Sequence, residues 1–240
     1  MYSFGSVANV THAPQARLTF NIWRRGGFKA GVEDYRWEVL RARLKNPLLL
    51  FMFNVLYICL AQSMLLMLHT APTYVFLLLA AVPEGHTLGA SDLVFTLILI
   101  LMIFIEYLAD QQQWEFQSAK KAYQTTASVP PEFTNTFTTD DLKRGFVVNG
   151  LWSWCRHSNF AAEQAIWLTL YLWACYDTRT YFNWSGIGVF ALILLFHGST
   201  IVTEEISAGK YPQYKEYQTR VGKFIPRPSF KPGGGWKKET

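Results

Sequence analysis

The sequence predicts an all-α fold, a polytopic membrane helix bundle with about five to six spans. Residues 46–83 and 180–203 contain no Asp, Glu, Lys or Arg. About 20 consecutive apolar residues are enough to cross the hydrocarbon core of a bilayer. In addition, 16% of the residues are aromatic, and Trp and Tyr collect at membrane interfaces. The alternative reading of this composition is a soluble helical protein with deeply buried helices.

The chain divides by composition into three parts. Residues 1–16 are predicted to be disordered, residues 17–226 to form one membrane domain, and residues 227–240 to form a flexible tail rich in glycine. Within the domain, residues 32–45 are predicted to form a basic interfacial helix. The segment 146–155 is apolar but short, which is typical of a re-entrant or interfacial segment. The predicted spans are 47–68, 72–83, 93–109, 160–176 and 184–203.

Both ends of the predicted domain are basic, in a chain with a net charge of +5. Basic flanks usually mark the cytosolic side of a membrane and favour anionic lipid. The predicted partner is therefore the lipid bilayer, and the predicted location is a multi-pass position in it. Nucleic-acid binding is a poor interpretation because there is no soluble basic domain to deliver it. The sequence leaves the oligomeric state undetermined.

A first group of polar residues lies at the end of the span predicted over residues 93–109. Glu106, Asp110, Gln113 and Gln117 are four, three and four residues apart, so they share one face of a helix. This stripe begins inside the span and emerges from it. It is either part of a polar site or an ordinary helix exit with a solvated face.

A second group lies between two apolar stretches. On a helix, Arg156, Asn159 and Glu163 would share one face, and the guanidinium of an arginine is suited to phosphate. Glu163 could orient Arg156 or accept from a ribose hydroxyl. His157 is either a packing residue or a ligand. Cys155 lies beside the Arg156 cation, which could lower the pKa of its thiol.

A third group follows the last predicted span. Tyr211 and Tyr214 are three residues apart, and Glu204, Lys210 and Lys215 lie close to them in the sequence. Aromatic rings with nearby cations can hold a base and its phosphates. An amphipathic helix on the lipid headgroups would show the same pattern.

Known phosphate and metal motifs are absent from the sequence. There is no Gly-x-Gly-x-x-Gly or Walker loop, and no nucleophile elbow of the Gly-x-Ser-x-Gly type. The five histidines and three cysteines form no His-x-x-x-His or Cys-x-x-Cys pattern, so no metal site is expected. A nucleotide site would have to be built from the side chains of helices and their connections.

Several motifs, taken in order, resemble the steroid 5-alpha-reductase-like membrane family, and in particular its fungal and bacterial branch. They cover most of residues 17–226, and their order is more specific than any single motif. The matching segments are residues 17–28, 33–37, 109–112, 150–163, 203–204, 211–217 and 224–226.

The resemblance implies an NADPH-dependent reductase acting on CH-CH groups, which reduces a C=C bond conjugated to a carbonyl in a sterol or other lipid. It implies an internal membrane, the endoplasmic reticulum in a eukaryote, and a lipid-soluble small-molecule substrate. By motif position, Tyr35 and Glu33 are the candidate catalytic residues. The residues implied to bind NADPH are Asp110, Arg156, His157, Asn159, Glu163, Glu204, Tyr211 and Tyr214.

The sequence departs from the family pattern within the motif around Arg156 and at its start. Ser158 replaces a proline and Ala162 replaces a glycine in the motif around Arg156. Relatives carry N-terminal membrane helices before the motif at residue 17, and the chain is expected to lack them. Two alternatives therefore stay open. One is an S-adenosylmethionine-dependent methyltransferase like the isoprenylcysteine carboxyl methyltransferases, and the other is a non-catalytic membrane protein that retains the scaffold.

Overall fold

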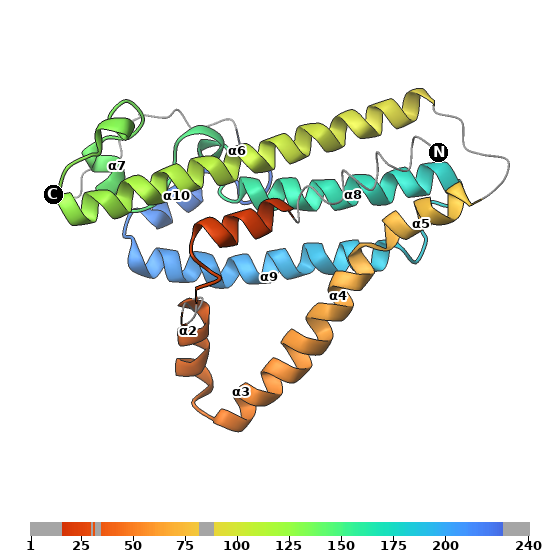
Figure 1. The fold of residues 1–240 in the computed structure, drawn as a ribbon, viewed down its shortest axis with the longest axis horizontal. Coiled ribbons are helices and arrows are strands. Elements are labelled where there is room, and N and C mark those ends of the chain that lie inside the picture. The colour runs from red at the N-terminus through yellow and green to blue at the C-terminus, as the bar shows by residue number, and fades with distance from the viewer. Residues whose placement is uncertain (1–15, 30, 32–34, 82–88, 228–240) are drawn as a thin grey trace. The chain divides into compact units, whose positions relative to one another are not determined.

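The computed structural model describes residues 16–29, 31, 35–81 and 89–227, and most of these residues are helical (Figure 1). A helix over residues 16–24 comes first. Within the described ranges, β-type pairing is limited to a single parallel bridge between Cys155 and Gly222. The predicted all-α fold is confirmed. The following elements are α2 (Tyr35–Leu44), α3 (Pro47–Phe53), η1 (Asn54–Ala61), α4 (Gln62–His69), α5 (Ala71–Ala80), α6 (Ala90–Thr126), η2 (Pro131–Phe133), α7 (Thr139–Arg144), η3 (Gly150–Ser153), α8 (Ser158–Thr178), α9 (Gly186–Lys210) and α10 (Tyr214–Arg220).

Three helical runs of the described chain are long and apolar enough to cross a membrane: Pro47–Leu79, Ala90–Thr126 and Gly186–Lys210. The protein is therefore membrane-embedded. The stretches predicted as two spans, 47–68 and 72–83, form one run of 33 residues with an irregular turn at Thr70. Helix α8 covers the span predicted at 160–176, but it is not among the three, because polar residues in its first turns lower its hydropathy. Residues 146–155 form no span, since η3 is only four residues long.

The first of two compact units contains the chain up to Ile100 together with Ile166–Leu194. Its aromatic centre is formed by α8, where the ring of Trp167 contacts His69 with centroids 4.3 Å apart. The ring of Trp173 lies between Phe76 and Phe95, and its Nε1 donates a hydrogen bond of 3.0 Å to buried Asp92.

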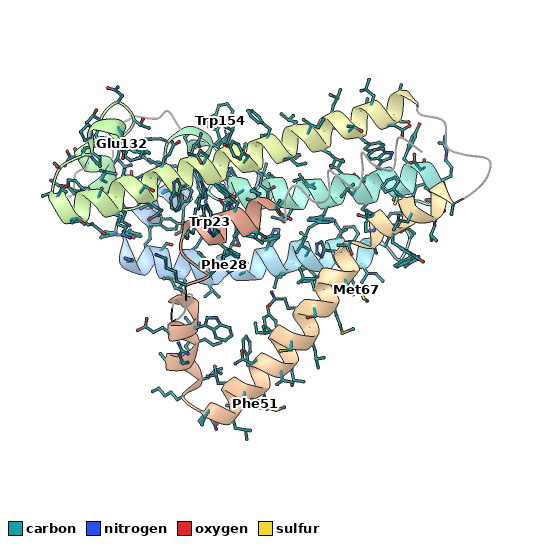
Figure 2. The ribbon with its side chains drawn as sticks, in the orientation of Figure 1. Trp23, Phe28, Phe51, Met67, Glu132 and Trp154 are labelled. Carbon is teal, nitrogen blue, oxygen red and sulfur yellow. The ribbon has the colours of Figure 1, made fainter. Side chains whose placement is uncertain are left out.

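The apolar run α3–α4 in this unit carries large side chains that are exposed. Phe51 and Met67, which are 62% and 68% exposed, project from it in Figure 2. None of the most apolar 18-residue window of Pro47–Leu79 is buried inside the protein. A helix that is apolar all round and unburied is typical of a segment that faces lipid.

The second unit contains Leu101–Ala165 and the chain from Leu195 onward. Two clusters of buried side chains form its core. One joins α6 to α7 and η3, and the other joins residues 146–148 to α10. The members of the first are Ala109, Phe116, Ala119, Phe137, Leu142, Val147 and Trp152, and those of the second are Phe146, Val148, Tyr214, Tyr217 and Val221.

Local sequence explains how the connecting elements of this unit begin and end. Thr138 and Asp141 form a capping box at the start of α7, in which each side chain accepts from the backbone N–H of the other. Gly145 ends α7 in the left-handed conformation with φ of 87°. Gln112 on α6 accepts a hydrogen bond of 3.0 Å from the Leu151 N–H, which attaches η3 to α6.

The predicted terminal segments largely fall outside the described residues. Residue 16, predicted to be disordered, begins the first described helix. The rest of 1–16, and 227–240 beyond residue 227, remain predictions. The predicted interfacial helix at 32–45 corresponds to α2, and its position at an interface also remains a prediction.

Candidate functional site

The candidate site lies in the second unit, where residues 154–157 run beside the chain after α10. The Arg156 N–H donates to the Gly222 carbonyl over 2.8 Å, and the His157 N–H donates to the Lys223 carbonyl over 3.2 Å. Trp154 projects outward in Figure 2, whereas the side chains that follow it are buried. Because α8 begins only at Ser158, Arg156 precedes the helix. The prediction that Arg156 shares a helix face with Asn159 and Glu163 was wrong, since Arg156 lies in a turn before α8 begins.

Arg156 and Glu204 form a buried ion pair with two parallel contacts. The Arg156 Nε donates to Glu204 Oε1 over 2.8 Å, and Nη2 donates to Oε2 over 3.3 Å. Arg156 Nη1 donates to the carbonyls of Gln218 and Val221 at the end of α10. The side chain of Gln218 donates to Glu204 Oε2 over 3.0 Å. A fork-to-fork pair of this kind fixes geometry as well as charge, and Glu204, not Glu163, is the carboxylate that orients Arg156.

His157 is the second partner of the same carboxylate. Its Nε2 lies 2.9 Å from Glu204 Oε1, and both side chains are buried. Because a carboxylate accepts hydrogen bonds, we assign the Nε2 hydrogen to this contact. The His157 ring is nearly parallel to that of Phe160, with centroids 5.7 Å apart, and Phe224 lies 5.8 Å away.

Asp110 and Asn159 form a separate polar pair between α6 and α8. The Asn159 Nδ2 donates to Asp110 Oδ1 over 3.0 Å, and Asn159 Oδ1 accepts from the Phe160 N–H. Glu163 is half-buried one turn further along α8. On α6 the polar stripe predicted from Glu106 to Gln117 begins at a fully buried residue, Glu106, and ends at an exposed one, Gln117. It therefore emerges from the protein interior along the helix.

Tyr211 lies between two lysines that are far apart in the sequence. Lys120 on α6 donates to the Tyr211 hydroxyl over 2.8 Å and to the Gly145 carbonyl over 2.7 Å. The ammonium of Lys210 lies 5.6 Å from the centre of the same ring. A side chain at Gly145 would clash, because a Cβ there would lie 2.4 Å from the Tyr211 ring.

Tyr214 is part of the core beside this group. Its ring contacts that of Phe146 with centroids 5.0 Å apart, and Phe146 also contacts Tyr211 at 5.7 Å. Burial raises the pKa of the Tyr214 phenol, and burial likewise raises the pKa of Tyr217, whose hydroxyl donates to the Trp152 carbonyl. These two phenols therefore stay neutral, and Tyr211 offers the more accessible ring.

Two opposing effects act on the thiol pKa of Cys155. The thiol is buried and donates to the Lys223 carbonyl over 3.2 Å. Burial raises the pKa of the Cys155 thiol, and this effect outweighs the lowering by the Arg156 cation. The lowering that the adjacent Arg156 cation could produce is therefore not the net effect, because desolvation dominates.

The two candidate catalytic residues near the N-terminus cannot be placed in this site. Glu33 lies outside the described residues, and Tyr35 begins α2 in the first unit with a side chain that is not described. The sequence also gave no role to Gln218, Lys120 or Phe146. Gln218 could have been found, since it lies four residues after Tyr214 on one helix. Lys120 carried no such signal, because it lies 91 residues from Tyr211.

Comparison with known proteins identifies the family. A family model described as a protein of unknown function, DUF1295, matches residues 7–221. The chain belongs to this family, which is the steroid 5-alpha-reductase-like family. An uncharacterised protein of Schizosaccharomyces pombe is 40% identical over 213 residues, which cover 88% of this chain and 60% of that relative. The chain thus spans less than two thirds of the length of this relative. No solved structure matches this chain significantly.

Proposed function

We propose that the protein is a membrane oxidoreductase that uses NADPH to reduce a C=C bond conjugated to a carbonyl in a sterol or other lipid. The observation that carries this proposal is the buried cluster of Arg156, Glu204 and His157, which lies within the residues that the family model matches. The proposal includes a multi-pass position in an internal membrane, the endoplasmic reticulum in a eukaryote, with the substrate arriving from the bilayer.

Stability alone is a weak explanation for this cluster. A buried ion pair often contributes no more to folding than well-packed apolar residues of similar volume would. Ionisable groups in a membrane-embedded helical body most often mark a functional site. Arg156 and Glu204 are both more than 90% buried and come from segments 48 residues apart, so folding has to bring them together.

The Arg156 guanidinium fits poorly as the phosphate ligand of a dinucleotide. Four of its five N–H groups already donate to Glu204, Gln218 and Val221, which leaves one for any ligand. Arg156 is better described as a positioning residue, because it fixes Glu204 and ends α10 by donating to its last carbonyls.

The cations around Tyr211 fit the nucleotide better. Lys120 has three N–H donors and uses two, Lys210 is exposed, and the Tyr211 ring is half-buried between them. A ring flanked by two ammonium groups suits an adenine and its phosphates. Asp110 and Glu163 would accept hydrogen bonds from ribose hydroxyls. When bound, NADPH would supply the hydride, and the residues of this chain would align it and exclude water.

The proposal is tested with detergent-purified protein, NADPH deuterated at the transferred position, and a panel of lipids that contain a conjugated carbonyl. We expect a product that has gained one deuterium and one hydrogen, detected by mass spectrometry. Lys120→Ala should raise the KM for NADPH about tenfold or more, whereas Lys121→Ala, its exposed neighbour, should not.

Two results would contradict this function. One is the absence of reduced product from every lipid in the panel, although the protein is folded. The other is transfer of a labelled methyl group from S-adenosylmethionine to a lipid carboxylate, which would assign the chain to the methyltransferases.

A further inference from the structure

We propose that His157 is the catalytic residue that polarises the substrate carbonyl, through a hydrogen bond from its Nδ1, beside an aromatic surface formed by Phe160, Phe196 and Phe224. This inference rests on the proposed reductase function. It gives His157 the catalytic role for which the family resemblance implied Tyr35 and Glu33. The ligand it predicts is the flat, carbonyl-bearing end of a conjugated lipid.

The orientation of His157 is fixed from one side. Its Nε2 is held at 2.9 Å by Glu204 Oε1, and Glu204 is itself held by Arg156 and Gln218. A carboxylate with three partners on two oxygens cannot turn without breaking one of them. Nδ1 therefore points away from Glu204, and among the described residues it takes part in no hydrogen bond.

The aromatic surface extends from the His157 ring. Phe160 lies parallel to it at 5.7 Å, Phe196 from α9 contacts Phe160 at 4.8 Å, and Phe224 contacts His157 at 5.8 Å. All three phenylalanines are half-buried and keep part of their surface accessible. Partly exposed rings next to a polar atom suit a ligand with a flat apolar body and one polar end.

The charges near His157 favour an electron-rich oxygen. Arg156 precedes it, and the Lys223 ammonium lies over the Phe224 ring at 5.3 Å and donates to the His197 carbonyl. Glu204 is the carboxylate in contact with His157, and it is already paired with Arg156. The His197 ring lies 4.7 Å from that of Phe224 on the other side. A cationic ligand would meet two cations here, whereas a carbonyl oxygen would be attracted.

The chemical consequence is carbonyl polarisation. Because Nε2–H already donates to Glu204, a donor at Nδ1 requires His157 to be the imidazolium, whose positive charge the Glu204 carboxylate balances. A hydrogen bond from its Nδ1–H draws electron density toward the carbonyl oxygen and away from the β-carbon, which becomes a better hydride acceptor. His157 keeps its proton. The proton that completes the saturated product at the α-carbon comes from water, and the hydride that completes the β-carbon comes from the reductant of the proposed function.

The test is infrared spectroscopy of a sterol with a 3-keto-4-ene ring, labelled with ¹³C at the carbonyl and bound to the protein without NADPH. We expect its carbonyl stretch to lie at lower frequency than in detergent micelles. His157→Gln keeps a donor near the Nε2 position that contacts Glu204 and loses the one at Nδ1, so the shift should disappear. His157→Asn keeps a donor near Nδ1 and should retain part of the shift.

Kinetics give the second readout. In the NADPH-loaded enzyme, His157→Gln should lower kcat about 100-fold with little change in the KM for sterol. His197→Gln, which alters the other histidine on Phe224, should change neither readout. A bound sterol whose carbonyl frequency is unshifted in the wild type, or equally shifted in His157→Gln, would overturn the inference. Either result can occur in a protein that still binds and oxidises NADPH, so it is distinct from a failure of the proposed function.

Discussion

At the scale of single residues, the stability of the folded protein depends on the pairing of Arg156 with Glu204. Both groups are buried, and loss of one partner leaves an uncompensated charge. We expect Glu204→Leu to lower the free energy of unfolding by about 3 to 5 kcal/mol, measured in detergent by denaturant titration. Glu205→Leu, at the exposed neighbouring position, should change it by less than about 0.5 kcal/mol. Equal losses in the two variants would contradict a structural role for the pair.

Cys155 gives a second prediction at this scale. Burial raises the pKa of its thiol, so little thiolate forms near neutral pH and alkylation is slow. In a protein with Cys59 and Cys175 replaced by alanine, N-ethylmaleimide should label the folded state at pH 7.5 at least tenfold more slowly than the SDS-denatured state. Equally fast labelling of both states would show that Cys155 is accessible and ionised.

Sequence reasoning selected polar residues that the structure places in hydrogen-bonded pairs, but it did not predict which residues pair. Arg156, His157, Asn159, Asp110 and Glu204 stand out because polar groups between apolar stretches are rare. The pairing of Arg156 with Glu204 could not be predicted, since it spans 48 residues and depends on how the helices pack. Periodicity suggested Glu163 instead, because it cannot detect that α8 begins after Arg156.

At the scale of elements, two glycines on α9 differ sharply in their surroundings. A Cβ at Gly188 would lie 2.1 Å from the Leu68 backbone carbon, whereas a Cβ at Gly198 would meet nothing within 4 Å. Gly188→Ala should therefore force α9 away from the end of α4 and destabilise the protein by at least about 2 kcal/mol. Gly198→Ala should be neutral or stabilise it by up to about 1 kcal/mol.

Thermal unfolding of the two alanine variants in the same detergent compares them directly. A lower melting temperature for the Gly198 variant than for the Gly188 variant would contradict the packing of α9 described here. The comparison is matched, because both glycines lie within one helix and both substitutions add a single methyl group.

Hydropathy predicted the long helices well and the short elements poorly. The charge-free stretches correspond to the run α3–α5 and to α9, because burial in lipid requires continuous apolar sequence. The segment 146–155 looked similar, but its residues pack into the core of the second unit. Hydropathy cannot tell whether a short apolar segment crosses the membrane or packs into a protein core. A 3₁₀ turn with Gly150 at φ of 63° lies in the middle of this segment.

At the scale of the whole molecule, the chain is a membrane-embedded helical protein of the steroid 5-alpha-reductase-like family. The buried polar cluster around Glu204 lies in the second unit, and the long apolar run α3–α5 lies in the first. The reductase function, its cofactor and its lipid substrate are proposals that join this polar cluster to the family.

Cofactor binding by the purified protein separates the reductase from the other candidate functions in one experiment. Detergent-purified protein is heated with NADPH, NADH or S-adenosylmethionine, and Lys120→Ala and Lys121→Ala are measured in parallel. A ligand that binds only the folded state stabilises it by about 2.7 kcal/mol at 100 times its Kd. We expect stabilisation by NADPH that Lys120→Ala weakens and Lys121→Ala retains. Stabilisation by S-adenosylmethionine alone, or by none of the three ligands, would contradict it.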